Sequence, residues 1–308
     1  MTTQSSATRR VPVAVPSAPP AGRASRSGVA LAALGVVAFS LTFPGTAWGL
    51  ESFGPWPLTA ARTSLAALLA LGCLLALRVR PPERRHRAGL AVVAGGVVVG
   101  FPLLTTLALE TSTTGHAAVV IGLLPLTTAA FSALRTGHRP SRTFWAAALA
   151  GAAVIVVFTV AQSGGSLSAG DAYLFGALVV CAAGYTEGGR LAREMPGWQV
   201  IGWALVACLP LALPAAAAGL ALEPARLSVH GVVGLAWIAF GSQFLGLVVW
   251  YRGMAAIGVA RASQLQLAQP LLTLVWSVLL LGERLSPAAP AAAVAVLVCI
   301  AVTQRART

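Results

Sequence analysis

Long apolar segments separated by short polar breaks dominate the chain. Each segment has about 17 to 24 residues, the length that an α-helix needs to cross a hydrocarbon core of roughly 30 Å. Ten segments are expected, at about residues 29–50, 57–77, 88–109, 116–134, 143–161, 172–189, 199–220, 229–251, 259–281 and 287–303. The pattern predicts an all-α integral membrane protein with about ten transmembrane helices.

The composition agrees with a membrane protein. Of 308 residues, 57% are hydrophobic and 9% are charged, whereas roughly a quarter of the residues of a soluble domain are charged. The four cysteines fall singly inside apolar segments, without the spacing of a metal site or a disulfide framework. A water-soluble fold is therefore excluded, and no metal is expected.

The net charge of +13 reports membrane topology rather than nucleic-acid binding, because the arginines lie in loops and not on one basic face. Arginine is favoured in loops that stay in the cytoplasm, and 18 of the 21 arginines fall in the two ends and in alternate loops. The other loops hold Arg226 and Arg284, together with five acids: Glu51, Glu110, Asp171, Glu223 and Glu283. Both termini are predicted to be cytoplasmic, in a multi-pass protein of a bacterial cytoplasmic membrane.

The chain contains an internal repeat with a constant offset of 145 residues between the fourth and ninth segments. The matched pairs are Pro125 with Pro270, Thr128 with Thr273, Ser132 with Ser277, Gly137 with Gly282, Arg139 with Arg284 and Ser141 with Ser286. Five crossings return the chain on the opposite side, so a five-helix repeat must be inverted. The predicted units are a basic tail (1–27), a first repeat (28–161), an external Gly/Ser linker (162–170), a second repeat (171–304) and a short cytoplasmic tail (305–308).

The first 27 residues are rich in Pro, Ser and Ala and are predicted to be disordered. A signal or transit peptide is the alternative interpretation, since the stretch is basic and free of acids. It is disfavoured because loss of the first segment would break both the even helix count and the repeat.

Several short motifs occur along the chain in a characteristic order and spacing: Phe39-Ser40-Leu41-Thr42-Phe43-Pro44, Arg62, residues 117–125, Gly170-Asp171, Trp250-Tyr251, Pro270 and Leu281-Gly282-Glu283-Arg284-Leu285-Ser286. Together they resemble the EamA-type ten-helix form of the drug/metabolite transporter superfamily. The chain departs from the common pattern in having His138 where the first repeat often carries an acid, and in having no lysine. The resemblance implies a secondary transporter with a central cavity between the two halves, open alternately to each side. Members carry varied small solutes, so the resemblance does not indicate the substrate.

Three prolines, Pro44, Pro125 and Pro270, are candidate helix breaks. Freed carbonyls are tolerated within a membrane only where they face protein or a watered cavity. Matching breaks in two halves are the best sequence indication of a binding site near the midplane, and Pro125 and Pro270 meet that description. A packed kink with a structural role is the alternative.

Polar and aromatic residues at membrane depth are candidates for the substrate cavity. They are Ser40, Thr42, Tyr185, Gln243, Trp250, Gln266 and Gln269. Gln266 and Gln269 are preferred, because they lie one turn apart beside Pro270. The same residue types also form hydrogen bonds between membrane helices, which is the alternative explanation.

Charged groups near membrane depth have two interpretations each. Glu187 could couple transport to protons if burial raised its affinity for a proton, or it could pair with Arg190 at the cytoplasmic end of its helix. Arg62 is expected to reach the outer interface or to pair with Glu51 or Glu110, and a contact with a substrate carboxylate is the alternative. His116 and His230 are expected to be solvated at the outer surface.

Other function classes lack their motifs. No lysine is present to form the phosphate-binding loop of an ATP-driven pump, and the zinc signature HExxH and the nucleophile motif GxSxG are absent. We therefore predict no catalytic residues and no cofactor. The chain is predicted to be a proton- or gradient-coupled exporter of small metabolites. Its expected partners are the lipid bilayer and a small-molecule substrate, and a homodimer is compatible with the prediction. A non-transporting scaffold or subunit, or an intramembrane enzyme, is the alternative.

Overall fold

The structure is a computed structural model that describes residues 26–136, 141–162, 167–257 and 265–305. All regular structure in these ranges is helical. Parts of the predicted tails and linker, namely 1–25, 163–166 and 306–308, lie outside the described residues, as do residues 259–264 of the ninth predicted segment.

The helices follow the ten predicted segments, several of which are built from more than one helix. Segments 1 to 5 are formed by α1 (Arg26–Ser40) with α2 (Thr42–Leu50), α3 (Pro55–Ala76), α4 (Arg84–Val93) with the π-helix η1 (Ala94–Gly100) and α5 (Phe101–Ala108), α6 (Thr114–Ile121) with α7 (Leu124–Thr136), and α8 (Arg142–Gln162). Segments 6 to 10 are formed by α9 (Ala169–Leu191), α10 (Gly197–Leu222), α11 (Val229–Ala236) with the π-helix η2 (Trp237–Gly246) and α12 (Leu247–Ile257), α14 (Gln269–Leu281), and α15 (Ala288–Arg305).

The length and hydropathy of these segments suit a membrane. Within the described residues, eight segments are long and apolar enough to cross a bilayer, and Gln269–Leu281 and Ala288–Val302 are shorter apolar helices. The all-α multi-pass architecture predicted from the sequence is therefore confirmed.

Local sequence signals explain several helix ends. Ser168 caps α9 by accepting a hydrogen bond from the backbone N–H of Asp171, whose side chain accepts in return from the backbone of Ser168. Pro55 occupies the first turn of α3, where its missing N–H is harmless. Gly282 ends α14 with φ of 64°, a left-handed conformation that glycine adopts without strain.

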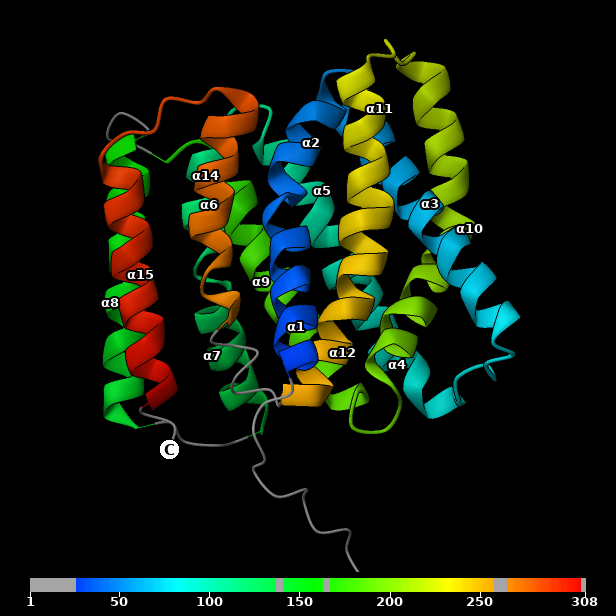
Figure 1. Ribbon diagram of the computed structural model, residues 1–308, viewed down its shortest axis with the longest axis horizontal. Coiled ribbons are helices and arrows are strands. Elements are labelled where there is room, and N and C mark those ends of the chain that lie inside the picture. The colour runs from blue at the N-terminus through cyan, green and yellow to red at the C-terminus, as the bar shows by residue number, and fades with distance from the viewer. Residues whose placement is uncertain (1–25, 137–140, 163–166, 258–264, 306–308) are drawn as a thin grey trace, which may run out of the picture.

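The contacts between the two halves follow a pseudo-two-fold pattern, in which equivalent helices pack on each other. The equivalent helices α3 and α10 pack on each other at one end of the molecule, and α8 and α15 pack on each other at the other end (Figure 1). Between them, segment 1 packs on segment 8, and segment 6 packs on segment 3. We name the face where α1 begins and α15 ends the terminus face, and the opposite face, where α8 ends and α9 begins, the linker face (Figure 1).

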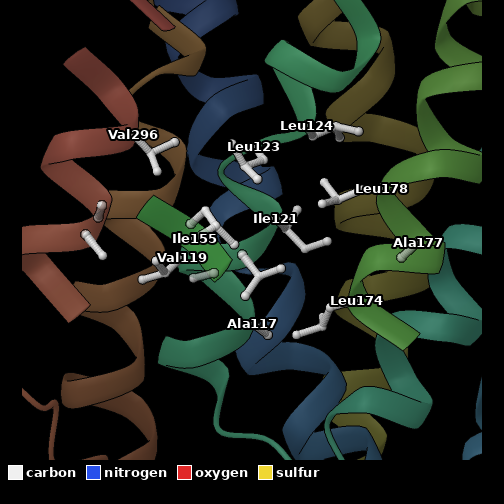
Figure 2. Packing of buried hydrophobic residues seen from close by; sticks show 14 of the residues in the cluster. Ala117, Val119, Ile121, Leu123, Leu124, Ile155, Leu174, Ala177, Leu178 and Val296 are labelled. Atoms are coloured by element: carbon white, nitrogen blue, oxygen red, sulfur yellow. The ribbon is translucent and has the colours of Figure 1, made fainter. Parts of the chain in front are cut away.

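The largest apolar core lies where segment 4 is surrounded by α8, α9 and α15. Figure 2 shows Ile121 of α6 between Ile155 of α8 and Leu178 of α9, with Val119 beside Ile155. All eight residues of α6 are buried, which places segment 4 in the interior of the bundle rather than at the lipid surface.

Small residues four positions apart, Gly96 with Gly100 and Gly184 with Gly188, allow segments 3 and 6 to approach closely. A Cβ atom added to Gly96 would lie 3.2 Å from the Cα atom of Gly184. The backbones of η1 and α9 therefore touch at this point, and a larger side chain at Gly96 has no room.

Candidate functional site

Helix breaks occur at equivalent positions in the two halves. Segment 4 is interrupted at residues 122 and 123, between α6 and α7, and segment 9 has turn residues at 267 and 268, just before α14. The two breaks are 145 residues apart, which is the offset of the sequence repeat. Proline has no N–H to donate, so Pro125 leaves the carbonyl of Ile121 without its helical donor, and Pro270 does the same to Gln266.

A small cavity lies at these two breaks. Its volume is about 30 Å³, enough for roughly two water molecules. Its lining includes both prolines, both residues with a freed carbonyl, a second glutamine and one aromatic residue from segment 1: Pro125, Pro270, Ile121, Gln266, Gln269 and Phe43. The preferred glutamines and two of the three predicted breaks thus come together at one site.

The third predicted break divides segment 1. The helix is interrupted at Leu41, and Pro44 is the third residue of α2. Two side chains of α14 bind this interruption, because Thr273 Oγ1 donates to the carbonyl of Ser40 and Trp276 Nε1 donates to its hydroxyl, both at 2.9 Å. Ser40 therefore joins segment 1 to segment 9, and Thr273 also lines the cavity.

A second polar group lies beside the first, where segments 1, 2, 3 and 8 meet. The hydroxyls of Thr42 and Ser242 are 2.6 Å apart. Next to Ser242, the side chain of Gln243 accepts a hydrogen bond of 2.5 Å from Arg62 Nε and donates to the carbonyl of Val98 at 3.5 Å. Thr42 and Gln243 are thus engaged in contacts between helices.

The expected position of Arg62 is wrong. Its side chain is only 4% exposed and bonds to Gln243, whereas Glu51 lies near His230, at 3.4 Å. The reason is that α3 begins at Pro55, so Arg62 lies two turns inside the helix, roughly 10 Å from its start.

Two predicted cavity residues lie elsewhere. Trp250 of α12 packs against α1, with its ring centroid 6.1 Å from that of Phe39. Tyr185 packs against the large apolar core. Neither residue lines the cavity at the helix breaks, and Ser40, Thr42 and Gln243 do not line it either.

Glu187 belongs to an ionic cluster at the terminus face. Its carboxylate is 2.7 Å from Arg190, the predicted partner, and 2.6 Å from Arg135 of α7, which the sequence did not indicate. Arg190 also bonds to Glu194 at 2.9 Å. A hydrogen bond from His86 lowers the pKa of Glu194 below its usual 4.5, and the same side chains lie 2.8 Å apart. The cluster joins the ends of α7 and α9 to the start of α4.

A different cluster fastens segment 4 at the linker face. The carboxylate of Glu283 accepts hydrogen bonds from the backbone N–H groups of Thr114 and Gly115, at 2.7 and 2.8 Å. His116, expected to be solvated, is 9% exposed and lies 2.7 Å from Asp171 of α9. The reason is that the start of α6 lies between α14 and α9. A cavity of about 400 Å³ beside this cluster is lined mainly by polar residues, including Gln162, Arg284 and Ser286.

Two five-helix halves, with equivalent helix breaks that line one cavity, define the chain as a multi-pass membrane protein. A model of the EamA-like transporter family matches the chain twice, at residues 26–160 and 168–304. The chain belongs to the EamA-like transporter family, within the drug/metabolite transporter superfamily.

Individual relatives agree with this assignment. The chain is 43% identical over 272 residues to the uncharacterized transporter YdeK of Bacillus subtilis (strain 168), a match that covers 88% of this chain and 95% of the relative. A crystal structure described only as that of a protein superimposes with a TM-score of 0.62 and 22% identity, over 90% of this chain and 96% of that one. The second match shows the fold alone.

Proposed function

We propose that this protein is a secondary transporter that exports small metabolites across a bacterial cytoplasmic membrane by alternating access. The observation that carries the proposal is the cavity at the two equivalent helix breaks, with Gln266 and Gln269 in its lining. Backbone irregularity at membrane depth is tolerated where it lines a protein cavity or a water path. Carbonyls without a helical donor, next to amide side chains, provide hydrogen-bonding groups for a small polar solute.

The inverted arrangement supports alternating access. Segments 4 and 9 cross the membrane in opposite directions and are broken at equivalent positions. A bend at one break opens a path to one face, and a bend at the other break opens a path to the opposite face. In this scheme Glu283 holds the linker face closed through the start of α6.

The arginine distribution supports an orientation with the terminus face in the cytoplasm. Arg135 and Arg190 at the ends of α7 and α9, and the arginine-rich start of α4, all lie at this face. Because arginines in short loops resist translocation, the proposed orientation has both ends of the chain inside the cell.

The test is untargeted profiling of small molecules outside cells that overexpress the parent protein or the double variant Gln266→Ala, Gln269→Ala, at equal membrane abundance. Gln199→Ala is the matched control, because Gln199 lies in the first turn of α10 and does not line the cavity. We expect at least one solute to be enriched outside cells with the parent and with the control, and at least tenfold less with the double variant.

Two results would count against the proposal. If the parent culture equals the empty-vector culture, export is unsupported, and saturable counterflow in vesicles then separates an importer from a protein without transport activity. If the double variant exports as well as the parent, the substrate site is not at the helix breaks.

A further inference from the structure

Arg62 is a buried cation without a counter-charge. Its side chain is 4% exposed and lies in the part of α3 that packs against η2. All eight acidic residues of the chain fall within the described ranges, and the ion pairs that they form involve other cations. An ionised side chain inside a membrane protein is expected to have a partner or a task.

The guanidinium makes one hydrogen bond to the described residues, which leaves its two terminal nitrogens without a protein acceptor among them. Nε donates to Gln243, a neutral amide, and this is the only bond from Arg62 to another described residue. Arginine carries five N–H donors, and four of them belong to the two terminal nitrogens, which match the two oxygens of a carboxylate or phosphate. Gln243 therefore orients the side chain without neutralising it.

A second polar side chain beside Arg62 also lacks a partner. The hydroxyl of Thr59 has no hydrogen-bond partner in the described structure, although Thr59 is only 5% exposed. Residues three apart share one face of a helix, so Thr59 and Arg62 are neighbours on α3. A buried hydroxyl and a buried guanidinium, both with unused donors, indicate that an acceptor of hydrogen bonds is missing from the site.

The position of Arg62 connects it to the transport site. Gln243 and Val98 are equivalent positions in the two repeats, 145 residues apart, and their contact lies where the two halves meet. The neighbouring pair Ser242 and Thr42 extends the polar contact to segment 1, and the residue after Thr42, Phe43, lines the cavity at the helix breaks. The cation is thus joined to the cavity through adjacent residues of segments 8 and 1.

We propose that Arg62, oriented by Gln243 and assisted by the hydroxyl of Thr59, binds the anionic group of the transported solute. The substrate class is then a small metabolite that carries a carboxylate or a phosphate group. This assignment rests on the proposed transport function and specifies its substrate class. In the rival explanation, Arg62 only holds segments 2 and 8 together.

The experiment measures thermal unfolding of the purified full chain in detergent, with sodium acetate or sodium phosphate as probe and sodium chloride keeping the ionic strength constant. Acetamide, the neutral analogue of acetate, is the third probe. We expect acetate or phosphate to raise the unfolding temperature saturably, and acetamide to have no effect, because a ligand that binds the folded state stabilises it. The oxyanion that acts at the lower concentration identifies the carboxylate or the phosphate class.

Variants separate binding from a structural role. Arg62→Gln is expected to weaken the response to the oxyanion at least tenfold, and Thr59→Val, which keeps the shape of the side chain, about threefold. Gln243→Glu supplies the missing counter-charge, so its unfolding temperature without probe is expected to equal or exceed that of the parent while the response is lost. Arg193→Gln removes an exposed arginine and is expected to respond like the parent.

Each contrary result overturns the assignment. Three results would do so. They are an unchanged response in Arg62→Gln, a response in Gln243→Glu equal to that of the parent, and no response of the parent to either oxyanion. If Arg62→Gln does not fold, Gln243→Glu and Thr59→Val decide. The binding assay does not need transport, so the two proposals can fail separately. If the parent binds the oxyanion but no metabolite is enriched outside the cells, only the export function is contradicted. If Arg62→Gln still exports the metabolite, only this assignment is contradicted.

Discussion

The two halves of the molecule share their backbone irregularities and differ in their charges. Both halves carry a π-helix in the third segment, η1 and η2, and both are broken before a proline in the fourth. By contrast, α3 contains Arg62 and its counterpart α10 contains no charged residue. Likewise, the acid Glu283 after segment 9 corresponds to His138 after segment 4. Shared backbone breaks suit equivalent bending at the two faces, whereas unequal charges make binding and fastening different on each side.

The first test of this comparison concerns the close approach of segments 3 and 6. Gly96→Val is expected to lower the free energy of unfolding by about 3 kcal/mol, because the new side chain meets the backbone of α9 near Gly184. Gly95→Val is the matched control, since a Cβ atom at Gly95 has no neighbour within 4 Å. Unfolding in detergent measures both, and equal losses would mean that the contact with α9 is not the cause.

The second test removes the acid that only the second half possesses. Glu283→Ala is expected to lower the free energy of unfolding by roughly 2 kcal/mol, because two backbone N–H groups at the start of α6 lose a charged acceptor. Glu110→Gln, at an exposed acid of the same face, is expected to have little effect. A Glu283 variant as stable as the parent would show that this contact does not fasten segment 4.

The third test asks whether the two shared breaks are equivalent in function. We expect Pro125→Ala and Pro270→Ala each to reduce export of the solute found by profiling at least tenfold, which corresponds to about 1.4 kcal/mol in the activation barrier of transport. The reason is that alanine restores the missing backbone N–H donor and straightens the helix. Neither variant is expected to be less stable than the parent. Pro214→Ala in α10 is the control, because Pro214 lies inside a helix and outside the cavity. A strong effect at only one break would contradict equivalent bending.

The fourth test concerns the charge cluster at the terminus face. Glu187→Gln is expected to lower the free energy of unfolding by about 1 kcal/mol, since its arginine partners remain partly solvated. The dependence of export on pH is expected to stay unchanged, because the contacts with Arg135 and Arg190 give Glu187 a structural role at the terminus face. A shifted pH profile in the variant would instead support proton coupling through Glu187.

The smallest expected effect is the dependence of the unfolding temperature on pH in the acidic range. Because the hydrogen bond with His86 lowers the pKa of Glu194 in the folded state, this contact stabilises the protein above pH 4.5 and is lost as the pH falls through the lowered value. The unfolding temperature of Glu194→Gln, measured from pH 6 downward, is expected to be slightly below that of the parent and to meet it at low pH. A constant difference at all pH values would exclude this titration as the cause.

The repeat was visible in the sequence because proline acts locally. Pro125 and Pro270 break a helix wherever they occur in its interior, so their matched positions predicted the two breaks that the structure contains. Gln266 and Gln269 could be added because they are close to Pro270 along the chain. The contacts of Arg62 and Glu283 could not be predicted, since Gln243 and Thr114 lie 181 and 169 residues away.

The sequence by itself determined the class of fold, the number of segments and the inverted repeat, because hydropathy, arginine placement and proline act through nearest neighbours and through the bilayer. The tertiary structure decided which polar groups meet. Of the predicted cavity residues, it brought only Gln266 and Gln269 to the cavity at the helix breaks. It also buried Arg62 beside a neutral amide and placed Glu283 at the start of α6. The physical reason is that the direction of a side chain within a bundle depends on how the helices rotate and cross, and packing between distant segments sets these angles.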